Sequence, residues 1–178
     1  MKNIYEEICE MKDLVRTGWQ MRLGDKNIRL ESDAEHIYSM QMIADYVMEK
    51  KDLDLDRLKV HDMILYHELG EIDAGDFTPL DNIGANDKHA RELNGVSRIA
   101  EKYVMPKYLL LWQEFEERQS EEAKFVYAMD KLDSILMAKH YSEKLNMPEL
   151  YDEFFARNHV HCQDYLDCFG LNEKDNTM

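Results

Sequence analysis

The residues best suited to chemistry lie within positions 59–79, KVHDMILYHELGEIDAGDFTP. In this stretch His67, Glu68 and Glu71 follow an apolar helical segment and precede a glycine-bearing loop with Asp76. Residues four apart share one helix face, so His67 and Glu71 should point the same way, with Glu68 about 100° round the helix. An imidazole flanked by carboxylates is a common ligand set for a divalent metal, although the same letters also describe a solvated helix end.

Two other interpretations of this stretch fit its spacing poorly. The zinc-protease helix H-E-x-x-H needs a second histidine four residues after the first, and that position holds Glu71. His61 and Asp62 form a literal His-Asp pair, but six residues turn a helix by about 240° net, so His61 should face away from His67. We therefore expect His67 to be the ligand and His61 and Asp62 to lie on an exposed helix face.

A second candidate ligand, His36, lies at the predicted N-terminal end of a helix. Ser32 and Glu35 form an S-x-x-E capping box, which predicts a helix over residues 33–50. His36 lies in the first turn of that helix. A histidine there is usually a surface residue or a core residue whose hydrogen bonds are satisfied, but this position also makes it available to a site shared with another helix end.

Asp130 lies in the middle of an apolar helix predicted over residues 120–144, with Ser120 as its cap. A carboxylate at such a position is costly to bury unless it is paired or ligates a metal. Asp130 is therefore either a metal ligand or the partner of a nearby lysine such as Lys131.

Residues 16–24 are expected to form a loop, because Gly18 and Gly24 interrupt the helical pattern. Arg16 in this loop could hold a phosphate through paired hydrogen bonds, and Trp19 could stack on a ring. The alternative is a tryptophan packed on the core, and without further context the sequence favours that alternative.

Together these residues resemble the HD-domain phosphohydrolase superfamily. Four elements match in order: E-S-x-A-E-H with His36, the pair His67-Glu68, Glu71 leading to G-D-x-T-P with Asp76, and A-K-F-V-x-x-x-D-K-L with Asp130. The segments R-T-G-W, with Arg16 and Trp19, and L-W-x-E-F-E are similar to the branch that includes bacterial 5′-deoxynucleotidases and their eukaryotic HD-domain relatives. The resemblance covers most of residues 12–145 and gives no guide to the C-terminal end.

The resemblance implies an all-α fold, an HD-domain bundle of six to seven helices in a single domain over residues 1–178. It places a metal site between the helices at 33–50, 58–71 and 120–144. It also implies a homodimer, with the aromatic C-terminal helix as one candidate interface. Further helices are expected at residues 3–15, 87–104, 109–118 and 148–169, and a loop at residues 73–86.

The resemblance also implies the parts of the site. One divalent transition metal (Mn, Fe, Co, Ni or Zn) would be held by His36, His67, Glu68 and Asp130. Arg16 would clamp the phosphate, Trp19 would lie against sugar or base, Glu71 would be the acid/base group, and Asp76 would meet the sugar or the leaving oxygen. The predicted substrate is a nucleoside 5′-monophosphate, above all a deoxynucleotide, which is hydrolysed to nucleoside and phosphate.

One departure from the family pattern keeps alternatives open. The name-giving pair is His-Asp, and here it is His67-Glu68, whose extra methylene moves the carboxylate by about 1.5 Å. The site could rearrange slightly, bind its ion more weakly, or have lost catalysis and serve as a nucleotide-sensing or structural protein. Another HD chemistry, phosphodiester cleavage or a di-iron oxygenase, needs a second metal, and the spare histidines His61 and His89 match no motif.

The amino-acid composition limits the number of domains, the partners and the cellular compartment that we expect. The chain of 178 residues fits one domain, and its 7 Gly and 3 Pro favour helices. A formal net charge of −15 without a Lys/Arg cluster argues against polymeric nucleic acid as a partner. We expect no membrane span, because no stretch approaches about 18 consecutive apolar residues, and no signal peptide at the acidic N-terminus. The three cysteines form no C-x-x-C pair, which suits a reducing cytoplasm.

Overall fold

The computed structural model describes residues 2–75 and 84–171. In that part of the chain the secondary structure is helical apart from one isolated bridge between Val15 and Ser32. The helices are α1 Ile4–Asp13, α2 Thr17–Leu23, α3 Asp33–Lys51, α4 Arg57–Tyr66, α5 Glu71–Ala74, α6 Ala85–Lys102, α7 Pro106–Glu117, α8 Glu121–Leu145, α9 Pro148–Cys162 and a final 3-10 helix, η1 Gln163–Phe169. The predicted all-α fold is confirmed for these residues. None of the helices described is long and apolar enough to cross a bilayer.

The predicted number of helices, six to seven, is too low, because two short helices form where the sequence suggests loop or helix end. Most of the stretch expected as a loop is α2, Thr17–Leu23, in which Gly18 lies inside the helix and Gly24 caps its C-terminal end. The helix expected over 58–71 ends at Tyr66, and α5 follows separately after a turn. The helix expected over 148–169 is divided into α9 and η1.

The helix starts predicted from capping residues are confirmed. Ser32 accepts from the Glu35 backbone N–H while the Glu35 carboxylate accepts from the Ser32 backbone N–H. Ser120 caps α8 by accepting from the Ala123 backbone N–H. These caps fix where α3 and α8 begin, and therefore which turn of each helix carries its metal-site candidate.

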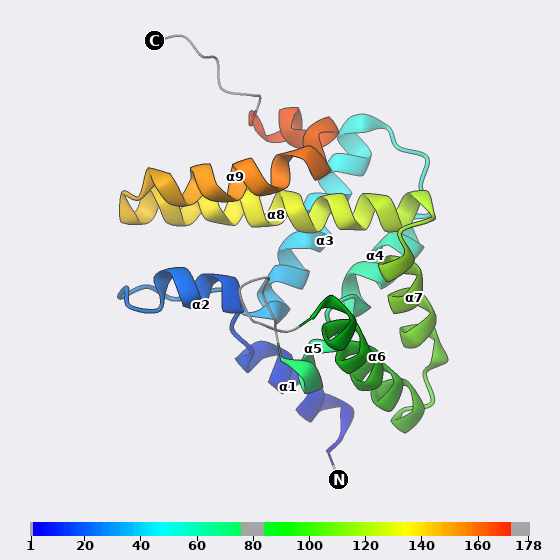
Figure 1. The fold of residues 1–178 in the computed structure, drawn as a ribbon. Helices are drawn as coiled ribbons and strands as arrows, with labels where there is room; N and C mark the ends of the chain where they lie inside the picture. The colour runs from blue at the N-terminus through cyan, green and yellow to red at the C-terminus, as the bar shows by residue number, and fades with distance from the viewer. Residues whose placement is uncertain (1, 76–83, 172–178) are drawn as a thin grey trace.

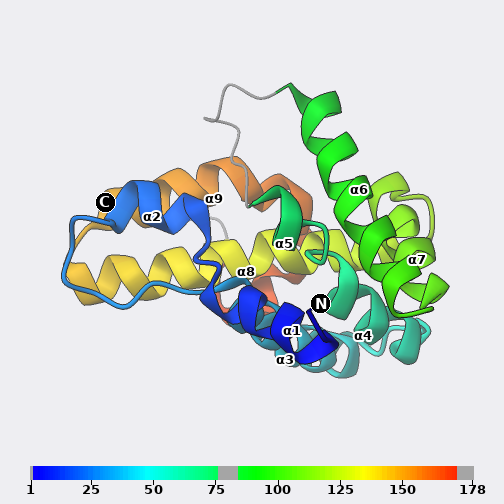
Figure 2. The same cartoon turned by 90° about the horizontal axis from the view of Figure 1, so that it is seen from below.

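The long helix α8 is the element on which the others assemble (Figure 1). Helix α9 returns antiparallel along it after a tight reversal at Asn146, whose φ is 53°. Helices α3 and α4 pack on α8 through the largest hydrophobic cluster, in which Met40, Val60, Met63, Met129 and Leu132 are fully buried. Figure 2 shows α6 and α7 on one side of this assembly and α2 beside α8 and α9 on the other.

Two glycines let α6 approach the turn after α4 closely. A Cβ at Gly70 would lie 2.7 Å from the Glu92 carbonyl oxygen, and one at Gly95 would lie 2.7 Å from the Gly70 carbonyl oxygen. Any side chain at either position would therefore force the two backbones apart. This contact brings Lys88 and Glu92 of α6 beside Glu71.

Candidate metal centre

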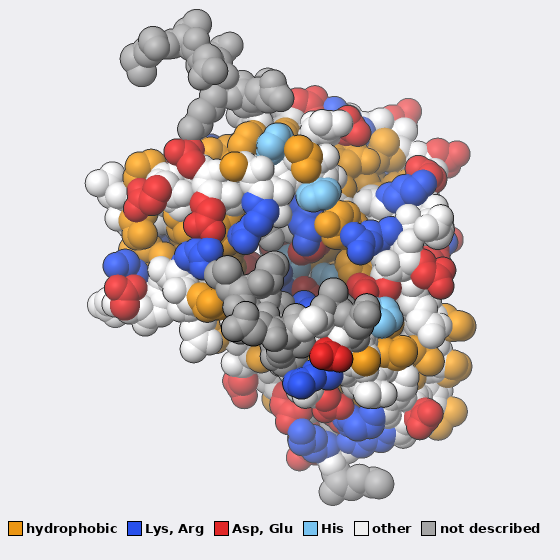
Figure 3. Space-filling model, in the orientation of Figure 1, with side chains coloured by type: hydrophobic (Ala, Val, Ile, Leu, Met, Phe, Trp, Pro, Cys, Tyr) orange, Lys and Arg blue, Asp and Glu red, His pale blue; other side chains and the backbone are white. Residues whose placement is uncertain are grey.

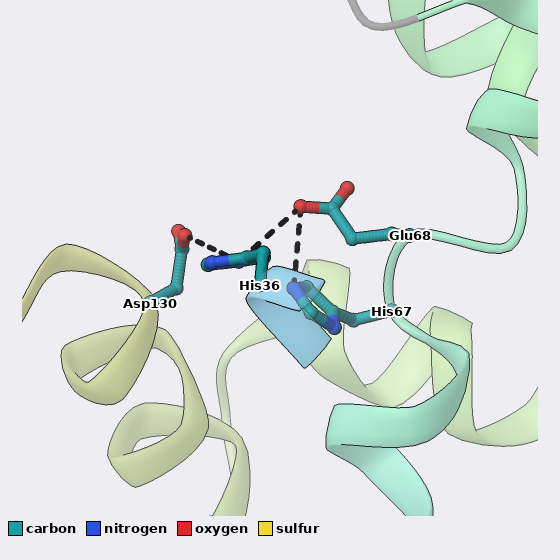
Figure 4. A group of neighbouring side chains, drawn as sticks. All are labelled: His36, His67, Glu68 and Asp130. Atoms are coloured by element: carbon teal, nitrogen blue, oxygen red, sulfur yellow. Dashed lines mark ion pairs between the residues drawn. The ribbon is translucent and has the colours of Figure 1, made fainter. Parts of the chain in front are cut away.

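Four side chains from three parts of the fold meet at one point, as the sequence predicts (Figure 4). His36 comes from the first turn of α3, His67 and Glu68 from the turn after α4, and Asp130 from the middle of α8. One ligand atom from each lies within 4.8 Å of the others. Glu68 Oε1 is 3.3 Å from His67 Nε2 and 3.7 Å from His36 Nε2, and His36 Nε2 is 3.4 Å from Asp130 Oδ1.

The Nδ1 atoms of both histidines already have hydrogen-bond partners. His67 Nδ1 lies 2.8 Å from the Ile64 carbonyl oxygen, which only accepts, so Nδ1 carries the proton. His36 Nδ1 lies 2.6 Å from Asp133 Oδ2. Both Nε2 atoms are buried and have no hydrogen-bond partner among the described residues. Because buried polar atoms are normally paired, two inward-facing Nε2 atoms beside two carboxylates fit a divalent ion.

The electrostatics of the centre suit the same ion. Burial raises the pKa of Glu68, but the His67 ring and the Arg16 guanidinium outweigh it, and the pKa is well below its usual range. The pKa of Asp130 is also lowered, because Lys131, His36 and Arg16 together overcome the effect of burial. Both carboxylates are therefore ionised at neutral pH and available as ligands.

The pKa of His36 is raised to about 10 when no ion competes for the ring. Burial and the Arg16 cation lower this pKa, but the neighbouring Asp130 and Asp133 carboxylates raise it more. A metal ligand must be a neutral imidazole, so His36 has to release a proton when an ion binds.

Arg16 lies at the edge of the same cluster. Its Nη1 is 2.9 Å from Glu68 Oε1 and 3.6 Å from Asp33 Oδ1, and its Nη2 is 3.8 Å from Asp130 Oδ1. A guanidinium this close to two of the ligand carboxylates can reach an anion that binds beside the ion.

A cavity of about 480 Å³ opens over His67, Glu68 and Asp130, and the buried His36 lies beneath them. Among the described residues its walls carry five carboxylates, those of Glu68, Glu71, Glu92, Glu116 and Asp130, and six cationic side chains, those of Arg16, Arg22, Lys88, Arg118, Lys131 and Arg157. Figure 3 shows Lys and Arg side chains gathered around this hollow, on a chain whose formal net charge is −15. The cavity is therefore suited to a small anion although the molecule as a whole is acidic.

Glu71 lies on the cavity wall next to the metal candidates and is 5% exposed. Lys88 Nζ is 3.7 Å from Glu71 Oε1 and 3.2 Å from Glu92 Oε1. Burial lowers the pKa of Lys88, but these two carboxylates outweigh it and raise the pKa. The sequence analysis missed Lys88 and Glu92, since a Lys and a Glu four residues apart on a polar helix are also typical of an ordinary surface pair.

Trp19 is 3% exposed and belongs to the hydrophobic cluster that holds α2 on α8 and α9. Its ring stacks on Phe154 with centroids 4.5 Å apart, and its Nε1 donates to Glu31 Oε2 at 2.9 Å. The indole forms part of the cavity wall, but its geometry is that of a core residue. A contact between Trp19 and substrate stays a prediction.

The other candidates are placed as follows. His61 lies outside the centre, as expected, but it is half-buried against Gln41 and Asp45 rather than on an exposed face. Asp76, and most of the loop expected at residues 73–86, lie outside the described residues.

Asp133 and Ser39 form a further layer that the sequence analysis missed. Asp133 is 2% exposed, and its second oxygen accepts a hydrogen bond from Ser39 Oγ. The only sequence signal for it is spacing, because Asp133 lies three residues after Asp130 and so on a neighbouring face of α8. Asp133 fixes the orientation of the His36 ring through the Nδ1 atom, on the side away from the other proposed ligands.

Comparisons with known proteins agree with this geometry. A family model described as HD domain matches residues 8–165, which include all four candidate ligands. The 5′-deoxynucleotidase HDDC2 of Mus musculus is 34% identical over 153 residues, which are 83% of this chain and 73% of the relative. The protein of the same name from Dictyostelium discoideum is 33% identical over 180 residues, 94% of this chain and 88% of the relative.

The fold is also similar to those of solved structures. A conserved hypothetical protein from Pyrococcus furiosus superimposes with a TM-score of 0.72 at 25% identity, covering 93% of this chain and 92% of that one. A predicted metal-dependent phosphohydrolase from Magnetospirillum magnetotacticum superimposes with a TM-score of 0.66 at 26% identity, covering 95% and 92%.

Proposed function

This chain belongs to the HD domain family, and we propose that it is a metal-dependent phosphohydrolase that releases phosphate from (deoxy)nucleoside 5′-monophosphates. The observation that carries the proposal is the pair of buried, inward-facing Nε2 atoms beside two ionised carboxylates, beneath a cavity lined by cations. The names of the mouse and Dictyostelium relatives supply the substrate class.

The proposed ligands of one divalent ion are His36, His67, Glu68 and Asp130. Two imidazoles with two carboxylates suit Mn, Fe, Co, Ni or Zn better than Mg or Ca. When bound, the ion would lower the pKa of a water molecule and polarise the phosphate. Glu68 suits the role of ligand despite its extra methylene, because its Oε1 lies close to the Nε2 atoms of both histidines.

The remaining residues would act on the substrate. Arg16 would hold the phosphate by hydrogen bonds from its guanidinium. Glu71 would take a proton from the attacking water and return it to the departing 5′ oxygen of the nucleoside. Lys88 would keep Glu71 in place through their contact. Asp76 would meet the sugar or leaving oxygen, and Trp19 would close the wall beside the nucleoside.

Phosphate release tests this proposal directly. Ribo- and deoxynucleoside 5′-monophosphates are offered to the wild type with Mn, Co, Zn or Mg, and bound metal per chain is measured alongside. We expect turnover with at least one transition metal and one ion per chain. His36→Gln should abolish turnover, whereas the control His61→Gln, in a half-buried histidine outside the centre, should leave it intact.

The variant Glu68→Asp decides between the alternatives. Turnover only in Glu68→Asp would mean that the wild type is a scaffold disabled at one position and would contradict the proposed activity. Two ions per chain would favour another HD chemistry. A wild type that binds nucleotide without hydrolysing any member of the panel would favour a sensing role.

We also propose a homodimer in the reducing cytoplasm. The aromatic side chains of α9 pack largely within the chain, whereas α3 exposes Tyr38, Met42 and Tyr46, at 70%, 58% and 47%, along one side. This stripe is therefore the better candidate interface. Light scattering of the purified protein tests the dimer, and the three free thiols support the compartment.

A further inference from the structure

The side-chain amide of Asn158 has no assigned role and lies in the wall of the substrate cavity. The residue is 8% exposed, on the part of α9 that the sequence motifs do not reach. Among the described residues nothing hydrogen-bonds this amide, and only the backbone carbonyl of Asn158 is engaged, by Cys162 Sγ. The amide is not among the side-chain groups that are both buried and unpaired, so it opens into the cavity, where a carboxamide can donate to and accept from a bound molecule. Its place on the wall points to a ligand.

The neighbours of Asn158 locate it relative to the metal centre. Helix α9 packs against α8, and the wall contributed by α8 includes Asp130, Lys131 and Ser134. Ser134 lies one turn beyond the proposed ligand Asp130, and its hydroxyl donates to the Asp130 carbonyl at 3.1 Å. Asn158 therefore lines the same cavity as the ion site, in which the rest of a bound nucleotide has to lie.

Two neighbours of Asn158 on α9, Phe154 and Arg157, also line the cavity. Phe154 precedes Asn158 by four residues and so lies on the same helix face. The guanidinium of Arg157 lies 4.7 Å from the centre of the Phe154 ring. Since the Phe154 ring is already covered by Trp19 and Arg157, the group that can meet a planar heterocycle is the exposed guanidinium of Arg157, which lines the cavity beside Asn158.

We propose that Asn158 recognises the nucleobase of the substrate and is a specificity-determining residue. This inference rests on the proposed nucleotidase function. With the phosphate at the ion and Arg16, the nucleoside extends along the cavity, and a carboxamide can donate and accept at once to a base edge. The amide gives this site a preference among bases that the metal and Arg16 cannot supply.

The test separates base from sugar and phosphate. Values of kcat and KM are measured for dAMP, dGMP, dCMP, dTMP and the base-free 2-deoxyribose 5-phosphate, in the wild type, Asn158→Leu and Asn158→Asp. Asn94→Leu is the matched control, because Asn94 is an exposed amide on α6 outside this cavity. Melting temperatures confirm that each variant is folded.

We expect Asn158→Leu to raise KM for the preferred nucleotide about tenfold, to level the differences among bases, and to leave 2-deoxyribose 5-phosphate within about twofold. Asn158→Asp should change the order of preference, since it replaces donors with acceptors. Equal losses for the base-free substrate, or unchanged KM for every nucleotide, would overturn the assignment.

The same experiments test the proposed hydrolase activity independently of the role of Asn158. A wild type that hydrolyses no substrate, the base-free one included, contradicts the hydrolase. Equilibrium dialysis of the four deoxynucleotides with the Mn-loaded protein then still decides the role of Asn158, because the assignment requires weaker and less selective binding in Asn158→Leu.

Discussion

At the scale of single residues, the two proposed histidine ligands differ in what holds them. The ring of His67 is held by a backbone carbonyl, whereas that of His36 is held by the buried carboxylate of Asp133. A carboxylate behind an imidazole fixes the ring and makes its other nitrogen a stronger donor to a metal. His36 should therefore contribute more to metal affinity through its partner than His67 does.

Asp133→Asn tests this difference. We expect the affinity for Co²⁺, followed by its absorption spectrum, to fall by about 10- to 100-fold. Asp45→Asn is the control, because Asp45 pairs with His61 at 3.0 Å outside the centre. A normal Co²⁺ affinity in Asp133→Asn, or an equal loss in Asp45→Asn, would show that Asp133 does not support the ligand.

Metal affinity should also depend on pH, with a sign given by His36. The pKa of His36 is raised to about 10, so below that pH an incoming ion has to displace its proton. The apparent affinity should therefore rise about tenfold per pH unit between about pH 7 and about pH 9, with one proton released per ion. Calorimetry in buffers of different ionisation enthalpy measures that proton. An affinity that does not vary with pH would mean that His36 is already neutral.

At the scale of elements, the sequence predicts best those helices whose ends are marked by side chains. Ser32 and Ser120 mark α3 and α8, and so place His36 and Asp130 correctly. Helices α2 and α5 have no side-chain cap, and α5 is only 4 residues long, so their positions depend on tertiary packing. The same limit explains why Asp133, Lys88 and Asn158 were missed, since their roles come from contacts between helices rather than from local pattern.

The contact between α1 and α6 depends on one buried carboxylate. Glu7 is 1% exposed and accepts from Arg98 Nη1 at 2.9 Å and Lys102 Nζ at 2.8 Å. Arg98 also binds Asp73 of α5, with Nη2 2.9 Å from Oδ1. The hydrogen bond from Arg98 is the main reason that the pKa of Glu7 is lowered to about 2, against the effect of burial.

Glu7→Gln should therefore lower the free energy of unfolding by about 3 kcal/mol at neutral pH. Because the folded pKa is depressed, this stabilisation is present above the unfolded pKa of about 4.5 and is lost as pH falls toward about 2. Urea unfolding at about pH 7 and about pH 3 should show the difference from wild type shrinking by about half. Glu101→Gln, an exposed position on α6, is the control; a constant difference at both pH values would contradict the pairing.

At the scale of the whole molecule, the charge of the cavity wall differs in sign from the net charge of the protein. The chain carries a formal net charge of −15, yet in the described part of the chain six cationic side chains outnumber the five carboxylates that line the cavity. The acidic exterior repels nucleotides while the cavity attracts them, so the local field has to capture the substrate within a short range. Salt should weaken that capture.

We expect KM for a deoxynucleotide to rise several-fold, with kcat nearly constant, as ionic strength goes from about 0.01 M to about 0.1 M, because the screening length falls from about 30 Å to about 10 Å. Arg118→Gln removes one cavity cation and should raise KM at low salt while reducing its dependence on salt. Arg57→Gln removes the same charge from a surface pair with Asp45 and Glu49 and should do neither. If both variants raise KM equally, the net charge of the protein governs capture; if only Arg118→Gln does, the cations of the cavity wall overcome the acidic surface around them.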